Sequence, residues 1–188
     1  MGATMQAHAH YRWMTAEDGP ALLRLHRRAI LLHAVRAYSP AMAHSWAEGL
    51  VAEGYARAAQ AGEAIEVAVL HGAVVGFCSV MADEIKGLYV DPGFMQQGVG
   101  RALLLRALWR IAEAGHAEAR VTAALSGVGF YEAMGFRPLR GVRHPTRGGL
   151  AMPVLEMARS LTSPPPGEDP DAYAAWAMTR LRPEALAS

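Results

Sequence analysis

The chain has 188 residues, 52% of them apolar and 19% charged, which excludes a disordered protein and suits one well-packed domain. A net charge of +1 argues against a nucleic-acid-binding surface, and the single cysteine, Cys78, excludes an internal disulfide and suits a reducing compartment. No apolar segment is long enough for a membrane span and no signal peptide is apparent, so we expect a soluble cytoplasmic protein that binds neither nucleic acid nor a membrane.

The first predicted elements are a short strand and a long helix. Tyr11–Met14 is the strand candidate, and Thr15 precedes Asp18 by three residues, a spacing typical of a capped helix start. Apolar residues then follow at spacings of three and four, which indicates an amphipathic helix that runs to about Arg36. Its expected apolar face consists of Leu22, Leu25, Ala29, Leu32 and Val35.

The remaining pattern mixes hairpins with helical crossovers, which predicts an α/β fold with a mixed sheet. A helical region over about residues 41–61 follows Ser39-Pro40, and His71-Gly72 is typical of a hairpin turn. Further strands are predicted at Ala64–Leu70, Val74–Met81, Glu84–Val90, Arg120–Ala123, Arg137–Arg140 and Leu150–Met157, and helices at Val99–Ala114 and Ser126–Met134. Residues 162–188 have the composition of a proline-rich linker and a helical tail, which we expect to dock on this domain or on the second subunit of a homodimer.

The segment GLYVDPGFMQQGVGRALL, residues 87–104, carries the most informative pattern. A strand stops at Asp91-Pro92, and Gly98 and Gly100 precede a helix, so about four unpaired backbone N–H groups would point one way at its positive end. Such a helix start favours an anion, for example a pyrophosphate. The spacing excludes both G-x-G-x-x-G and G-x-x-x-x-G-K-[ST]. A turn that merely packs well is the alternative.

The same segment resembles the acetyl-CoA loop of the GNAT N-acetyltransferases, in which a strand ending in V-x-P is followed by [QR]-x-x-G-x-[GA]. Gly98 and Gly100 fall on the last two motif positions, while Met95 stands where Gln or Arg is usual. A second segment, SGVGFYEAMGF, resembles the family's N-A-x-x-F-Y-x-x-x-G-F, with Ser126 and Gly127 in place of Asn-Ala. On these motifs, residues 11–161 are identified as similar to a small bacterial member of the GNAT superfamily.

The resemblance implies a single domain over residues 1–161 with a mixed, mostly antiparallel central sheet, flanked by helices and splayed at the strand that binds acetyl-CoA. It also implies acetyl transfer from acetyl-CoA to an amine, with the pantetheine arm along residues 88–90 and the pyrophosphate on the amides of residues 95–101. The implied cofactor-binding residues are Leu88, Tyr89, Val90, Met95, Gln96, Gln97, Gly98, Val99, Gly100, Arg101, Ser126, Phe130 and Tyr131.

Two residues are candidates for proton transfer. Tyr131 matches the family position that donates a proton to the departing CoA sulfur, which suits a phenol that is protonated at neutral pH. Glu84 stands fourteen residues before Gly98, where the histone-acetyltransferase branch has its general base. The alternatives are a packing tyrosine and a solvated strand end. Arg101 is expected near a phosphate, and Arg106 and Arg110 on a solvated helix face.

The acceptor is the least determined part of the prediction. Tyr38 and Ser39 lie where the family builds its acceptor pocket, with Trp46 as a wall, although a turn with a packing tyrosine explains them equally well. The absence of an acidic run favours a small-molecule amine over a polycationic acceptor. The eight histidines form no H-x-x-x-H pair, so no metal site is predicted. A non-catalytic acyl-CoA sensor is the competing function, and a nicotinamide-dependent enzyme is disfavoured by the missing third glycine.

Overall fold

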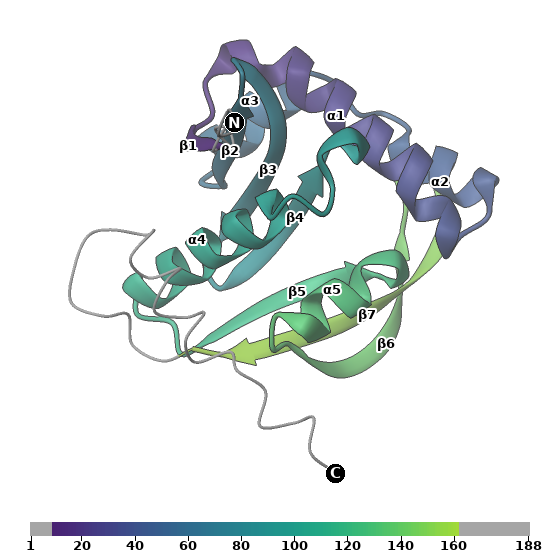
Figure 1. Cartoon of the computed structure of the whole chain (residues 1–188). Coiled ribbons are helices and arrows are strands. Elements are labelled where there is room, and N and C mark those ends of the chain that lie inside the picture. Colours follow the sequence, from purple (N-terminus) through teal and green to yellow (C-terminus); the bar gives the residue numbers. More distant parts are fainter. Residues whose placement is uncertain (1–8, 162–188) are drawn as a thin grey trace, which may run out of the picture.

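A computed structural model describes residues 9–161 of the chain (Figure 1). Within these residues, seven strands form one sheet of order β1-β2-β3-β4-β5-β7-β6, in which β4 and β5 run parallel and all other neighbours run antiparallel. The strands are β1 (His10–Trp13), β2 (Ala64–Leu70), β3 (Ala73–Met81), β4 (Glu84–Val90), β5 (Glu118–Ala124), β6 (Arg137–Pro145) and β7 (Ala151–Ser160). The predicted α/β class with a mostly antiparallel sheet is confirmed. The expected linker and tail helix lie outside the described residues.

Helices cover both faces of the sheet. Figure 1 shows α4 over the β1–β4 half and α5 over the β5–β7 half. Apolar residues of α4 pack with one set of side chains from β2, β3 and β4, while α1 and α3 pack with the alternate set, which includes Val67 and Phe77. The helices are α1 (Gly19–His33), α2 (Pro40–Ala47), α3 (Glu53–Gln60), α4 (Val99–Glu113) and α5 (Val128–Ala133). No helix in the described part of the chain is long and apolar enough to cross a bilayer.

The first helix starts as predicted but buries a different face at its end. The Thr15 N–H donates to the Asp18 carboxylate at 2.7 Å, and a 3-10 turn leads into α1. Leu32 and Val35, expected in the core, are 56% and 44% exposed, whereas Ile30 and Ala34 are buried. The expectation was wrong because each step of three residues falls about 60° short of a full turn, so repeated steps of three leave the core face.

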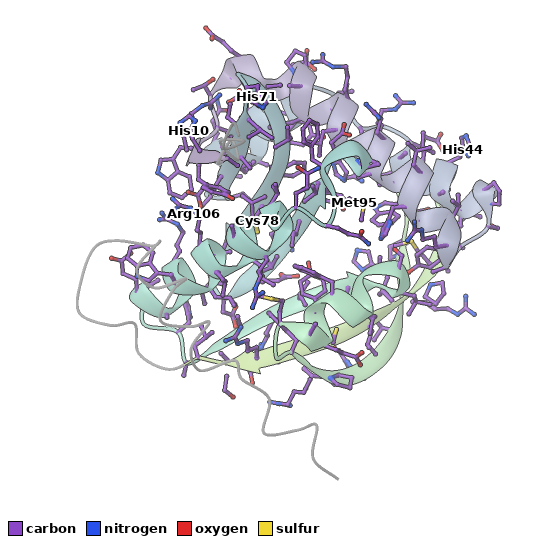
Figure 2. All side chains as sticks on the ribbon, viewed as in Figure 1. His10, His44, His71, Cys78, Met95 and Arg106 are labelled. Atoms are coloured by element: carbon purple, nitrogen blue, oxygen red, sulfur yellow. The ribbon has the colours of Figure 1, made fainter. Side chains whose placement is uncertain are left out.

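Two further expectations are corrected. The helical region 41–61 is two helices, because the chain becomes extended at Glu48 (ψ 144°) before α3 begins. Arg106 and Arg110 do not form a solvated face. Arg106 of α4, labelled in Figure 2, donates to the Glu66 carboxylate of β2 at 2.8 Å. The Arg110 guanidinium lies 3.9 Å from the centre of the Trp13 ring. Both arginines therefore bind α4 to the first two strands.

The parallel pair β4–β5 is short. Only Glu84 and Ile85 of β4 have partners in β5, namely Arg120 and Val121. Beyond Ile85 the two strands diverge toward the start of α4 (Figure 1). The predicted splay is therefore present, and it separates the two halves of the sheet where the glycine loop begins.

Candidate active site

The loop between β4 and α4 leaves the start of the helix open. Gly98 caps α4 with a left-handed backbone (φ +84°), which glycine adopts without strain. The first bond of the helix joins the Ala102 N–H to the Gly98 carbonyl at 3.0 Å, so the N–H groups of residues 98–101 lie outside the helical ladder. A Cβ built on Gly98 would meet no atom within 4 Å. Open donors at the positive end of a helix fit an anion.

The second glycine of the motif has a packing role. A Cβ on Gly100 would lie 3.3 Å from the Val90 side chain, so a larger residue would push α4 away from β4. The loop before it is held by the Asp91 carboxylate, which accepts from the Gly93 N–H at 2.9 Å. Met95 lies on this loop (Figure 2) and is partly exposed. The two motif glycines thus serve different physical purposes.

A cavity of about 430 Å³, the first cavity, opens between the splayed strands and the start of α4. Its walls come from β4, the glycine loop, the end of β5 and the start of α5, and α1 closes one side. The predicted cofactor-binding residues that line it are Leu88, Tyr89, Val90, Met95, Gln96, Gly98, Gly100, Arg101, Ser126, Phe130 and Tyr131. Gln97 and Val99 do not line it: the Gln97 side chain donates to the Gly93 carbonyl, and Val99 is buried in the core.

Tyr131 combines burial with access to the first cavity. Its ring is 7% exposed and packs edge-on against Phe130 and Phe136, with ring centres 5.3 and 5.4 Å away. Burial is the main cause that raises the pKa of the Tyr131 hydroxyl above its usual value, and Cys78 raises it further. The hydroxyl is therefore a neutral donor across the physiological range. Cys78 itself is buried, and its thiol pKa is raised by the same cause, so it is no nucleophile.

A second cavity, of about 580 Å³, adjoins the first. Both cavities share lining residues of β4, including Gly87 and Tyr89, together with Trp46 of α2 and Thr122 of β5. The second cavity extends from there toward α1, α3 and the turn between β6 and β7. A group bound in one cavity can therefore meet a group bound in the other along the splayed part of β4.

Comparisons with known proteins agree with this geometry. A family model described as an acetyltransferase (GNAT) domain matches residues 50–138. The uncharacterized N-acetyltransferase YafP of Escherichia coli (strain K12) is 29% identical over 131 residues, which cover 70% of this chain and 83% of YafP. These matches support an acetyl-CoA-dependent acetyltransferase of the GNAT superfamily.

Solved structures share the GNAT fold over most of the chain. The crystal structure of a GCN5-related N-acetyltransferase from Rhodopseudomonas palustris has a TM-score of 0.77 at 23% identity and covers 85% of this chain and 100% of that one. The PaiA N-acetyltransferase from Thermoplasma acidophilum, in complex with coenzyme A, has a TM-score of 0.65 at 22% identity, with 81% and 99% covered. The open helix start and the unpaired stretch of β4 fit the pyrophosphate and the amide-containing arm of acetyl-CoA.

Among the other predicted residues, Glu84 and Trp46 line a cavity. Glu84 lies in the wall of the second cavity, where its carboxylate accepts from Lys86 at 2.9 Å. Trp46 lines both cavities. No group of three or more His, Cys, Asp and Glu side chains within residues 9–161 could hold a metal ion.

Tyr38 and Ser39 have the structural roles of the alternative explanation. The Tyr38 hydroxyl donates to the Pro153 carbonyl and accepts from the Leu125 N–H, both at 2.7 Å, and so ties the turn before α2 to β7 and to the turn that follows β5. The Ser39 side chain caps α2 by accepting from the Met42 N–H. Neither residue lines the first or the second cavity.

Sequence reasoning missed several residues of the second cavity. His26 of α1 is 6% exposed, its ring centre lies 3.8 Å from that of Tyr89, and its Nδ1 shares a hydrogen bond of 3.0 Å with the Tyr55 hydroxyl of α3. Arg147 enters from the β6–β7 turn. These residues come from three elements far apart in the sequence, and no local spacing relates them. A histidine on the apolar face of the first helix was the one available signal for His26.

Proposed function

We propose that the chain acetylates the primary amine of a small molecule bound in the second cavity, by direct attack, with Tyr131 as general acid. The observation that carries this proposal is the meeting of the two cavities along β4, since Gly87 and Tyr89 belong to both walls. Acetyl-CoA, when bound, supplies the acetyl group as an activated thioester. A volume of about 580 Å³ lies in the usual range for small-molecule sites, which supports a small acceptor over a protein amine.

The cofactor would be held mainly by backbone groups. The open amides at the start of α4 would donate to the pyrophosphate, and each charge-assisted bond contributes about 1.5–3 kcal/mol. Beyond Ile85 the β4 backbone is not paired by β5, which supports its use by the pantetheine arm. Because these donors are backbone groups, Met95 in the place of Gln or Arg is compatible with binding.

Tyr131 would give its proton to the sulfur that leaves. Its raised pKa keeps the proton on the hydroxyl until charge develops on the sulfur. Burial in the same apolar surroundings also destabilises the CoA thiolate and so raises the pKa of the thiol. The two pKa values therefore rise together, which keeps proton transfer from the phenol to the sulfur feasible.

Glu84 is the proposed base. Its carboxylate lies in the wall of the second cavity beside Lys86, at the end of β4 where the sheet is still closed. A relay through water would let this carboxylate take up the proton that the acceptor's ammonium group must lose before its neutral amine attacks the thioester.

The competing function, an acyl-CoA sensor without turnover, is separated from the enzyme by two measurements on the same protein. Isothermal titration with acetyl-CoA and CoA tests binding, and release of free thiol in the presence of an amine panel tests transfer. We expect both in the wild type. Binding without thiol release from any amine would favour the sensor.

A matched pair of variants tests the location of the cofactor. Gly98 and Gly72 both have left-handed backbones (φ +84° and +78°) and open space where a Cβ would lie, but only Gly98 borders the first cavity. Gly98→Trp is expected to abolish binding of acetyl-CoA, and Gly72→Trp is expected to retain it. Equal affinity of the two variants would contradict the placement of the pyrophosphate at α4.

A further inference from the structure

The second cavity carries an excess of positive charge. Its lining includes the cations Arg57, Lys86 and Arg147 and the carboxylates Glu63 and Glu84. Lys86 and Glu84 pair with each other at 2.9 Å, and within residues 9–161 no ion pair is formed by the other three. The remaining charges are the guanidinium groups of Arg57 and Arg147 and the carboxylate of Glu63, which gives the cavity an excess of one positive charge. An acceptor with several ammonium groups would add repulsion to such a cavity.

Arg147 is held in place by the residues on either side of it. The Thr146 hydroxyl shares a hydrogen bond of 2.6 Å with the buried Ser45 hydroxyl, and the Gly148 N–H donates to the Ser45 carbonyl at 2.8 Å. The Arg147 guanidinium donates one bond, of 3.3 Å, to the Trp46 carbonyl. Because a guanidinium has about five N–H donors in a planar fork, most of its donors are left for a ligand.

The lining residues on which the Arg147 charge acts, His26, Tyr55 and Tyr89, are themselves neutral. Burial lowers the pKa of His26 to about 3, so its imidazole carries no charge near neutral pH, and the Arg147 charge lowers the pKa of His26 further. Burial raises the pKa of the Tyr55 hydroxyl to about 12 and raises that of Tyr89 above its usual value, and the Arg147 charge opposes both shifts, so this charge acts across the cavity. The Nε2 atom of His26 is buried with no partner among the described residues.

We propose that the acceptor is an amine that also carries a carboxylate, as amino acids do, and that Arg147 binds this carboxylate from the β6–β7 turn. The proposal rests on the proposed function, since it names the acceptor of the same site. An excess of one positive charge matches one monoanionic group, and a guanidinium fork binds a carboxylate with two parallel hydrogen bonds. The amine of the same molecule then points toward β4, where the two cavities meet.

The test compares each of the twenty proteinogenic amino acids with its own α-amide in the thiol-release assay. We expect the preferred amino acid to exceed its amide by about 10-fold or more in kcat/KM, the effect of losing a charge-assisted contact. Arg147→Gln is expected to raise KM for the amino acid by a similar factor, to change kcat little, and to leave the amide unaffected. Arg147→Lys, which retains the charge, is expected to recover part of the loss.

Arg143 provides the matched control. It lies on β6 just before the turn, is exposed as Arg147 is, donates to the Ala151 carbonyl and is not part of the second cavity's lining. Arg143→Gln is therefore expected to leave KM unchanged. Equal use of acids and amides, or an equal effect of Arg147→Gln on both, would overturn the carboxylate assignment while leaving acetyl transfer intact.

A binding measurement separates failure of this inference from failure of the proposed function. Isothermal titration of the CoA-saturated protein with the same amino acids needs no turnover. Binding of amino acids that is weakened by Arg147→Gln, without thiol release from any amine, would retain the carboxylate site and reject the transferase. Failure of every amino acid to bind or react would reject the inference.

Discussion

Tyr131 combines packing in the core with the chemistry proposed for its hydroxyl. Tyr131 does have the packing role that the sequence offered as an alternative, because its ring is buried between Phe130 and Phe136. The same burial raises the pKa of the Tyr131 hydroxyl, and the residue also lines the first cavity. The F-Y-x-x-x-G-F motif therefore specifies a donor that the core itself holds in position.

Removal of the Tyr131 hydroxyl tests its proposed role directly. Tyr131→Phe keeps the ring contacts and removes the proton donor, so kcat should fall by about 100-fold or more, within the usual range for general acid catalysis. The affinity for acetyl-CoA and the melting temperature should be close to those of the wild type. Steady-state kinetics and isothermal titration provide these values, and a loss of kcat smaller than about threefold would speak against the general acid.

At the scale of elements, the position of α4 decides whether the site exists. The helix rests on β3 and β4 through side chains that need close backbone approach, and a Cβ on Gly76 of β3 would lie 3.1 Å from Leu103 and Val99 and 3.2 Å from the Tyr89 carbonyl. These contacts are tighter than ordinary packing distances. The strand that carries Gly76 thus fixes how near the helix start lies to the splayed part of β4.

Two strand glycines make this dependence measurable. Gly76→Ala should destabilise the fold by about 1–3 kcal/mol, as overpacking does, because the methyl group meets backbone as well as side chains. Gly141 of β6 has nothing within 4 Å of its Cβ position, so Gly141→Ala should be neutral or slightly stabilising. Urea denaturation measures both free energies of unfolding. A Gly76→Ala protein as stable as Gly141→Ala would mean that α4 can shift freely.

Local signals explain which elements could be predicted. The bounds of β2 and β4 and the start of α4 agree with the sequence prediction, because β-branched runs and turn residues mark them directly. The wall that α1 gives to the first cavity and the entry of Arg147 into the second depend on tertiary packing, which leaves no periodicity in the chain. The buried face of α1 was predictable only in its first turns, because the later apolar residues follow at steps of three, which are shorter than one helical turn.

At the scale of the whole molecule, a buried histidine couples folding to pH. His26 lies among Tyr55 of α3, Phe77 of β3 and Tyr89 of β4, with Arg147 nearby, so its imidazole joins helices and strands that line the second cavity. Protonation would place a second positive charge beside Arg147 in a buried site. The folded protein therefore resists it.

Stability should fall in mild acid for this reason. The pKa of His26 is about 3 when folded and ordinary when unfolded, so between pH 6.5 and 3 the unfolded chain binds the additional proton, and acid favours unfolding. The His26 contribution amounts to a loss of about 2 kcal/mol between pH 7 and pH 5. Urea denaturation at both values measures it, with His44→Gln, an exposed histidine of α2 (Figure 2), as a control that should not alter the loss.

A second measurement of the His26 pKa needs no His26 variant, which could fold poorly. Imidazole chemical shifts of the wild-type protein report the same property, and the His26 ring should remain uncharged at pH 5. A His26 ring that titrates near pH 6.5 would contradict the prediction.

The short β4–β5 ladder has a consequence for the life of the protein in the cell. Only two residue pairs join β4 to β5, so most of the β4 edge that faces β5 has no backbone partner in the described part of the chain. A cofactor arm that pairs with this edge would act as an additional strand. Ligand that binds only the folded state adds about 2.7 kcal/mol of stability at a concentration one hundred times its Kd. The steady-state abundance of the enzyme would then follow the supply of acetyl-CoA, so that metabolic state sets how much of the protein escapes proteolysis as well as how fast it works.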